Sequence, residues 1–152
     1  SLHIISRPGY EMLINQAIEK AEYFADIINQ HEDFELITEP ELCLLTYRYV
    51  PKLVQATLKR VNEEQQAEIN LLLGKLTEFI QKRQREDGRS FVSRTRIKVG
   101  RYNGEKMIVF RVVLANPLTS KGILPGILTE QCELAKESED FLPDLLAMAK
   151  AG

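Results

Sequence analysis

Apolar residues recur along the chain with two different spacings, and the spacing identifies the elements. From Pro8 to about His31 they fall at steps of three and four residues, which predicts one long amphipathic helix. The pattern then becomes strand-like. It predicts a short strand over 34–38, a turn at Glu39-Pro40 and a longer strand over 42–50. The first third of the chain is therefore predicted to be a helix followed by two strands.

The middle of the chain predicts two helices and a hairpin. Helical spacing between residues 52 and 87 predicts a short helix and then a longer one, with Asn62 placed as the cap of the second. Residues 91–99 then alternate between apolar and polar, and 107–114 is mostly apolar. Asn103-Gly104 between the two runs is typical of a tight turn, so these strands are expected to pair antiparallel.

Two further helices are predicted after residue 118. Thr119 could cap the first of them, although Pro125-Gly126 indicates that its regular part begins at Pro125. The last helix runs from about Asp140, with Pro143 in its first turn, where a proline is tolerated. Helices and strands in this order predict an α+β fold, in which helices pack on a small, mostly antiparallel sheet.

Composition indicates one ordinary domain in a reducing compartment. A chain of 152 residues with 44% hydrophobic residues can bury a single core, and a net charge of -2 gives no general attraction to nucleic acid or membrane. The sequence lacks the long apolar run of a membrane helix and the pattern of a secretory signal, so a cytoplasmic location is expected. Because the chain begins with Ser1 and not Met, we expect it to be a fragment.

Conventional catalytic and metal-binding motifs are missing from the sequence. Cys43 and Cys132 belong to no C-x-x-C pair and have no histidine close in sequence, so both are expected to be small buried hydrophobic residues. His31 is expected to interact with the end of the first helix and not to take part in catalysis. No nucleotide-binding, hydrolase or zinc-binding motif is present, so no metal site is predicted.

Arg111 is the candidate functional residue. It lies within the apolar run 107–114, and the two-residue period of a strand places it on the face of Met107, Val109 and Val113. Burying an unpaired guanidinium is costly, so Arg111 must meet an acid, carbonyl oxygens or a bound anion. An internal salt bridge, an edge-strand arginine whose charge reaches water, and a carboxylate-binding group therefore all remain open.

Cations also cluster between the longer helix and the hairpin. We call this cluster the basic stripe: Lys82, Arg83, Arg85, Arg89, Arg94, Arg96, Lys98 and Arg101. On the strand, alternate positions place the cations on one face, which predicts a solvated surface. An anion-binding or RNA-binding surface is the alternative, although few aromatic residues are interleaved for stacking on bases.

Three stretches of sequence together resemble a known family. They are FELITEPEL and LTYRYVP within 34–51, SFVSRT at 90–95 and FRVVLANPLT at 110–119. These stretches resemble the C-terminal part of the group II pyridoxal-phosphate-dependent amino-acid decarboxylases. Within the family, HIISRPGY at 3–10 and the helical region before Ser90 are most similar to the pyridoxal-dependent aspartate 1-decarboxylases.

The resemblance implies an organisation for the complete protein. Residues 1–31 would form a long helix that connects to a large domain absent from this sequence, and residues 32–152 would form the C-terminal small domain, as in fold-type I enzymes. The large domain would hold pyridoxal 5'-phosphate on a lysine, and the protein would be a cytoplasmic homodimer. Its reaction would be the decarboxylation of an acidic amino acid, aspartate to β-alanine or glutamate. A diaminobutyrate decarboxylase or a non-enzymatic interaction or RNA-binding module remains the alternative.

The same resemblance assigns one residue of this chain to the substrate. Arg111 matches the arginine that binds a substrate carboxylate in glutamate-decarboxylase-like members. The family's cofactor lysine, and the aspartate that pairs with the pyridine nitrogen, have no counterpart here, so no catalytic or cofactor-binding residue is assigned and the isolated chain is expected to be inactive. Arg48 has no matching role in the family, and we interpret it as part of a structural ion pair.

Overall fold

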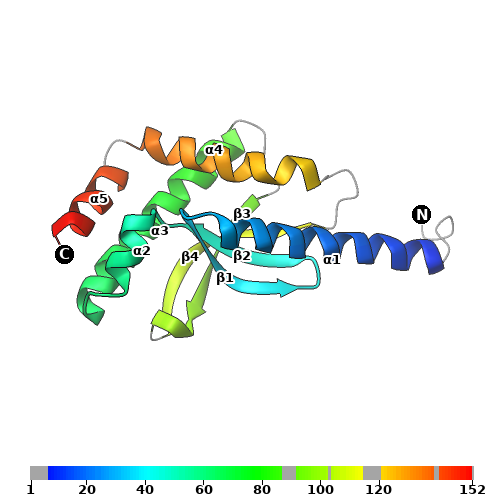
Figure 1. Ribbon diagram of the computed structural model, residues 1–152, viewed down its shortest axis with the longest axis horizontal. Helices are drawn as coiled ribbons and strands as arrows, with labels where there is room; N and C mark the ends of the chain where they lie inside the picture. Colours follow the sequence, from blue (N-terminus) through cyan, green and yellow to red (C-terminus); the bar gives the residue numbers. More distant parts are fainter. Residues whose placement is uncertain (1–6, 87–91, 103, 115–120, 139–140, 152) are drawn as a thin grey trace.

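The chain folds into helices packed against one four-stranded sheet. The computed structural model describes residues 7–86, 92–102, 104–114, 121–138 and 141–151 (Figure 1). The elements, in chain order, are α1 (Arg7–Gln30), β1 (Phe34–Glu41), β2 (Leu44–Tyr49), α2 (Lys52–Leu58), α3 (Glu63–Glu86), β3 (Val92–Val99), the short 3-10 helix η1 (Gly100–Tyr102), β4 (Glu105–Val113), a second 3-10 helix η2 (Lys121–Ile123), α4 (Leu124–Glu137) and α5 (Phe141–Ala151).

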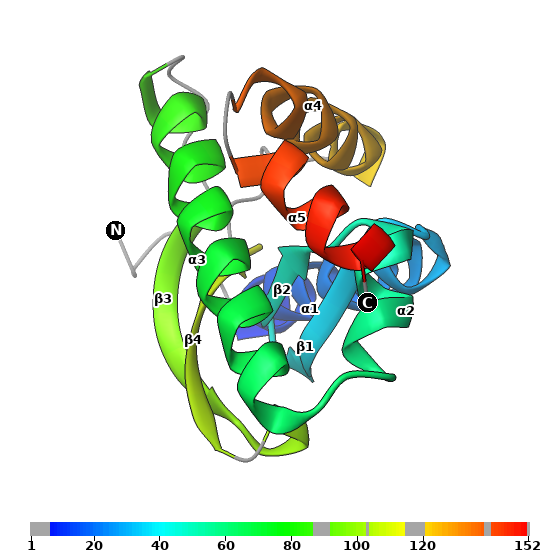
Figure 2. The same cartoon turned by 90° about the vertical axis from the view of Figure 1, so that its left-hand side faces the viewer.

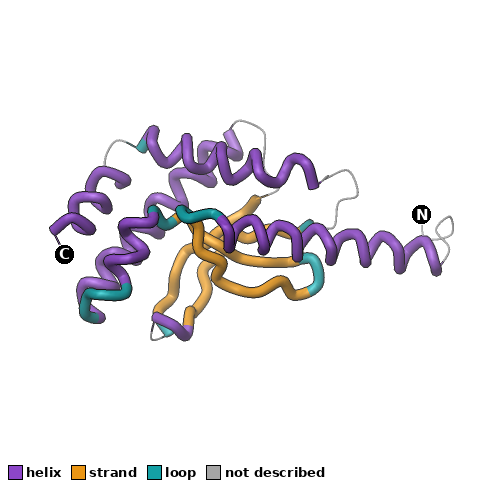
Figure 3. The backbone as a smooth tube through the Cα atoms, in the orientation of Figure 1, coloured by secondary structure: helices purple, strands orange, loops and turns teal. Residues whose placement is uncertain are grey.

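The sheet has the strand order β1-β2-β4-β3, and every neighbouring pair is antiparallel. β2 and β4 are therefore its central strands. The four strands lie together as one layer (Figures 2 and 3). α1 and α4 contact the face of β2 that carries Tyr47, whereas Asn70 of α3 reaches the opposite face at Arg48. This is the α+β arrangement that the sequence predicts.

One face of the central strands contacts the helices. The Tyr47 ring of β2 packs edge-on against Phe24 of α1, with ring centroids 5.4 Å apart. The Tyr47 hydroxyl donates a hydrogen bond of 2.8 Å to Oε1 of Gln131 on α4. Phe110, the partner of Tyr47 in β4, lies on the same face, with ring centroids 5.2 Å apart. Much of the buried core lies between this face and the helices, and Met107 and Val109 extend it to the opposite face of β4.

The turn between β1 and β2 lies later than the sequence predicts. Glu39 and Pro40 are part of β1, and the chain reverses at Leu42-Cys43. Leu42 adopts a left-handed conformation with φ of 56°, which is unusual for a residue with a bulky side chain. The prediction failed because β1 is an edge strand with two register shifts, and an edge strand tolerates a proline at such irregularities.

The β3–β4 hairpin extends beyond the rest of the sheet. Its pairing runs from Val92↔Val112 to Val99↔Glu105, whereas β2 pairs with β4 only as far as Tyr47↔Phe110. The distal half of the hairpin therefore leaves β2 and curves away below α3 (Figure 2). Its connection is longer than the predicted two-residue turn, because η1 precedes Gly104, which has a positive φ of 72°.

The helix boundaries agree with the sequence signals where the structure describes them. The Asn62 side-chain oxygen accepts a hydrogen bond from the Gln65 backbone N–H at 2.9 Å, which confirms the predicted cap of α3. α4 begins at Leu124, one residue before Pro125, and Pro143 lies in the first turn of α5. The proposed cap at Thr119 lies outside the described residues.

The long first helix is confirmed, but only part of it packs on the body. Ala21, Phe24 and Ile28 are buried, whereas Met12 and Ile14 are exposed. Figure 1 shows the N-terminal part of α1 projecting past the sheet.

Candidate functional site

Arg111 lies at the centre of a polar row that crosses the sheet. Its Cα partners are Thr46 on β2 and Ser93 on β3, and Thr46 pairs in turn with Thr38 on β1. We call Thr38, Thr46, Arg111 and Ser93 the polar row. Successive residues of a strand point to opposite faces, so the row lies on the face opposite Tyr47 and Phe110.

Hydrogen bonds fix the row around Arg111 without using its guanidinium. The hydroxyls of Thr38 and Thr46 are 2.7 Å apart, and the Thr46 backbone N–H donates to the Thr38 hydroxyl at 3.1 Å. The Ser93 hydroxyl donates to the backbone carbonyl of Arg111 at 3.3 Å. These hydrogen bonds hold the backbone of Arg111 in place and leave its guanidinium available for another contact.

The structure changes the expected setting of Arg111. Met107 and Val109, on the same face of β4, are buried, but Arg111 is exposed and Val113 beyond it is 41% exposed. No described carboxylate forms a salt bridge with Arg111. Strand alternation could not predict this change, because it assigns residues to a face but does not show which parts of that face other elements cover.

Two of the three roles considered for Arg111 conflict with this geometry. An internal salt bridge would need an acid beside it among the described residues. The edge-strand position is wrong because β4 is a central strand, but the exposed side chain reaches solvent, as that role also required. A carboxylate-binding group is consistent with an exposed guanidinium that has no described acid as partner.

Arg48 is the other arginine within an apolar strand. Two of its guanidinium nitrogens are hydrogen-bonded, whereas its buried Nη2 has no hydrogen-bond partner among the described residues. Arg48 is 1% exposed, its Nε donates to Glu35 Oε1 at 2.6 Å, and its Nη1 donates to Asn70 Oδ1 at 2.9 Å. The Tyr102 hydroxyl donates to the second oxygen of Glu35 at 2.7 Å, and the Arg48 guanidinium lies 5.0 Å from the Tyr102 ring centroid. The structural ion pair predicted for Arg48 is confirmed, and it links β1, β2, α3 and η1.

His31 and Cys132 come together in space but do not form a nucleophilic pair. The Asp33 backbone N–H donates to His31 Nδ1 at 3.1 Å, which leaves the ring proton of a neutral imidazole on Nε2, 4.0 Å from the sulfur of Cys132. Burial raises the pKa of the Cys132 thiol to about 11, so the thiolate is disfavoured. Both cysteines are free and only partly buried, which corrects the expectation of full burial.

The basic stripe does not form one continuous surface of free charge. Arg83 pairs with Glu137 at 3.2 Å, and Arg94 pairs with Glu78 at 3.7 Å. The predicted solvated face of β3 is confirmed, because Arg94, Arg96 and Lys98 are all exposed. Arg89 and the side chain of Arg101 lie outside the described residues.

The described part of the chain contains neither a metal-binding cluster nor a membrane-spanning helix. No group of three or more His, Cys, Asp or Glu residues there is arranged to hold a metal ion. None of the described helices combines the length and the apolar character needed to cross a membrane.

The described residues do not form a pyridoxal phosphate site by themselves. Such a site needs a lysine for the carbonyl carbon and an acid for the ring nitrogen. A cavity of about 440 Å³ near Lys59 also contains Glu35, but that carboxylate is already bound by Arg48 and Tyr102. A second cavity of about 460 Å³ near Lys136 and Lys150 is otherwise lined by Leu142, Pro143, Leu146 and Ala147.

Comparison with known proteins shows a strong similarity in sequence. No family profile matches the chain. It is 63% identical over 141 residues to the aspartate 1-decarboxylase of Aliivibrio fischeri, and the match covers 93% of this chain and 26% of that protein. The chain spans about a quarter of the length of this relative.

Solved structures share the fold at lower identity. Mouse CSAD superposes with a TM-score of 0.69 at 24% identity, over 86% of this chain and 25% of that protein. Oryza sativa TDC, solved with PLP and tryptamine, gives 0.63 at 16% identity, over 90% and 25%. The glutamate decarboxylase domain of a Vibrio parahaemolyticus diaminobutyrate-pyruvate transaminase and L-2,4-diaminobutyrate decarboxylase gives 0.62 at 16%, over 86% and 23%. The predicted fold class is confirmed.

The sequence pointed to Arg111 but not to the residues that lie beside it in the sheet. Thr46 and Ser93 lie in two of the stretches that carry the family resemblance, yet their alignment beside Arg111 depends on the register of three strands. The partners of Arg48 were missed for a similar reason, because Asn70 and Tyr102 belong to other elements.

Proposed function

We propose that this chain is the small domain of a longer, pyridoxal-phosphate-dependent amino-acid α-decarboxylase. Residues 1–31 would connect it to a large cofactor-binding domain, and residues 32–152 would complete the substrate pocket. The proposal is supported by 63% identity to a protein named aspartate 1-decarboxylase, along 93% of this chain. It is also supported by a fold shared with proteins named as decarboxylases, and with one solved in the presence of PLP.

The observation that carries the proposal is the exposed guanidinium of Arg111, which forms no salt bridge with a described acid. A planar guanidinium binds a carboxylate through two parallel hydrogen bonds, which fixes orientation as well as position. In our proposal the cofactor's electron-sink chemistry belongs to the large domain. Arg111 would hold the side-chain carboxylate of the substrate, so that the α-carboxylate is presented to that domain.

This role favours an acidic substrate over the alternatives. Aspartate and glutamate each carry a second carboxylate, which a fixed guanidinium attracts. Diaminobutyrate carries a second amine, whose positive charge Arg111 would repel. An RNA-binding role for the basic stripe gains no support, because Arg83 and Arg94 are paired with acids. We therefore favour conversion of aspartate to β-alanine, with glutamate as the second candidate.

The projecting part of α1 fits the same arrangement. Met12 and Ile14 are exposed large hydrophobic side chains on a helix that leaves the body of the chain. Exposed apolar surface of this kind is typical of a contact region. In the proposed cytoplasmic homodimer, these residues would pack against the large domain and the partner subunit.

Replacement of Arg111 in the complete protein tests the proposal. Arg111→Met removes the charge at similar length, and Arg111→Lys keeps the charge but loses the planar fork. Loss of a charge-assisted contact in a desolvated pocket costs about 2 to 4 kcal/mol, or roughly 30- to 1000-fold in kcat/KM for aspartate. The lysine variant should recover only part of this loss.

A matched control separates a local role from a general charge effect. Arg85→Met makes the same chemical change at an exposed position in the last turn of α3 and should leave kcat/KM unchanged. Steady-state kinetics with aspartate, glutamate and diaminobutyrate, together with the cofactor absorbance spectrum, provide the measurement. Wild-type kinetics in Arg111→Met, with intact cofactor binding, would exclude the substrate-binding role.

A further inference from the structure

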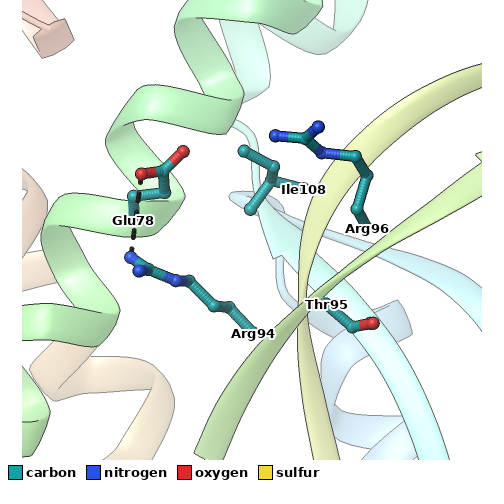
Figure 4. A pocket seen from close by; sticks show the side chains of 5 residues that line it. All are labelled: Glu78, Arg94, Thr95, Arg96 and Ile108. Carbon is teal, nitrogen blue, oxygen red and sulfur yellow. Dashed lines mark ion pairs between the residues drawn. The ribbon is translucent and has the colours of Figure 1, made fainter.

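A groove between α3 and the β3–β4 hairpin holds a second concentration of positive charge. It is lined by Glu78, Arg94, Thr95, Arg96 and Ile108, and its volume is about 280 Å³ (Figure 4). Several water molecules would fill such a space, so it has room for a small ion. The groove is separate from Arg111, because Ile108 and Arg111 lie on opposite faces of β4.

Strand geometry brings the two arginines of the groove together. Arg94 and Arg96 are two residues apart on β3, so their side chains leave the same face with Cα atoms about 6.6 Å apart. Ile108 pairs with Arg96 across the hairpin and forms an apolar floor between the two side chains. Thr95 points away from α3 (Figure 4). The strand therefore presents two guanidinium groups to one narrow space.

The charge in this groove is only partly compensated. Glu78 of α3 lies 3.7 Å from Arg94, and both side chains are well exposed, so this ion pair is weak. No described carboxylate forms a salt bridge with Arg96. One acid thus serves two guanidinium groups that are held close to an apolar surface. An added oxyanion could bridge both arginines through their planar N–H donors.

We propose that the groove is a binding site for a small free oxyanion of the carboxylate or phosphate class. The ligand would contact Arg96 and Arg94 and would lie over Ile108, at the junction of α3 with the hairpin. Glu78 would compete with the ligand for Arg94, which limits its affinity. This site is independent of the proposed function, because it uses neither Arg111 nor the other residues of the polar row.

The test is a titration of the complete protein with inorganic phosphate and, separately, with acetate. The protein is saturated with pyridoxal phosphate and carries Arg111→Met, so that neither the proposed cofactor pocket nor Arg111 attracts the added ion. Calorimetry at constant ionic strength should show one saturable site. Binding of phosphate alone assigns the phosphate class, and binding of acetate as well assigns carboxylates to the same site.

Three further substitutions in the Arg111→Met protein distinguish a specific site from general attraction of anions. Arg96→Met should weaken binding at least about tenfold, because it removes the unpaired guanidinium. Glu78→Gln should strengthen binding about threefold, because it removes the competing carboxylate. Lys98→Met removes a charge from the same face of β3 outside the groove and should change affinity less than about twofold.

The opposite results would overturn the proposal. Absence of saturable binding by both ions would exclude the site. Equal weakening by Arg96→Met and Lys98→Met would show that only the general field of the strand attracts anions. Weaker binding in Glu78→Gln would mean that Glu78 supports the site and does not compete with the ligand.

Discussion

The two arginines of the central strands lie on the same face of the sheet but have opposite surroundings. Arg48 of β2 lies where β4 has parted from β2, and it is enclosed by Glu35, Asn70 and Tyr102. Arg111 of β4 lies where the strands are still paired, and no described acid binds its guanidinium. An arginine within an apolar strand can therefore have a structural or a functional role. Which role it has depends on whether partners from other elements reach it.

This comparison separates stability from function. A buried arginine that is paired and hydrogen-bonded is costly to remove, because its partners lose their compensation. An exposed arginine without a described partner contributes little to stability, so its replacement should change the free energy of unfolding little. The difference leads to three predictions, which begin with the largest effect.

Removing Arg48 should produce the largest loss of stability. Arg48→Met would remove the cation that pairs with the Glu35 carboxylate. The expected loss in the free energy of unfolding is about 3 kcal/mol, the lower end for a broken buried pair, because Glu35 keeps some exposure to solvent. Arg83→Met, which breaks the exposed pair with Glu137, should cost less than about 1 kcal/mol. Urea unfolding of both variants measures the difference, and equal midpoints would contradict the prediction.

The network of Arg48, Glu35, Asn70 and Tyr102 should also make the stability of the protein depend on pH in the alkaline range. Burial, with a contribution from Glu35, raises the pKa of the Tyr102 hydroxyl from 10.0 to about 12, although Arg48 acts in the opposite direction. The folded state then holds this proton more tightly than the unfolded chain. Its stabilising contribution is complete below pH 10 and is lost as the pH rises from 10 to 12.

Tyr102→Phe isolates this contribution from those of other tyrosines. Burial also raises the pKa values of Tyr47 and Tyr49, so the parent protein loses stability at high pH for several reasons. In the variant, the slope of unfolding free energy against pH between 10 and 12 should be less steep by up to about 1.4 kcal/mol per pH unit. Parallel curves for variant and parent would remove Tyr102 from this account.

The smallest expected effect is that of Arg111 on stability. Arg111→Met should change the free energy of unfolding by less than about 0.5 kcal/mol, because no described acid loses a partner. The free energies of unfolding of Arg111→Met and Arg48→Met, measured under the same conditions, compare the two arginines directly. A loss as large as that of Arg48→Met would show that Arg111 has a structural partner in the complete protein.

Much of the fold could be predicted from the sequence, because the spacing of apolar residues is a local property. The long first helix, the hairpin and the cap at Asn62 all depend on residues close together in the chain. The prediction of a turn at Glu39-Pro40 was wrong because an irregular edge strand can contain a proline. The real turn includes Leu42, which is not a residue that turn propensities favour.

The candidate site could be predicted only in part. The apolar run around Arg111 and the family resemblance pointed to this residue, but neither could show that it is exposed while Met107 and Val109 on the same face are buried. That difference depends on which parts of the face other elements cover, as α3 does at Arg48. The polar row requires the register of four strands, and its role in binding a substrate stays a prediction.

The displaced register of β1 also affects how the sheet ends. Edge strands offer unpaired N–H and C=O groups to any other strand that approaches, and this is a common route to aggregation. In β1 the register shifts on both sides of Thr38, and Pro40 has no N–H to donate, so a neighbouring strand would find an interrupted ladder. The bulged segment that defeated the turn prediction thus discourages this edge from recruiting a fifth strand.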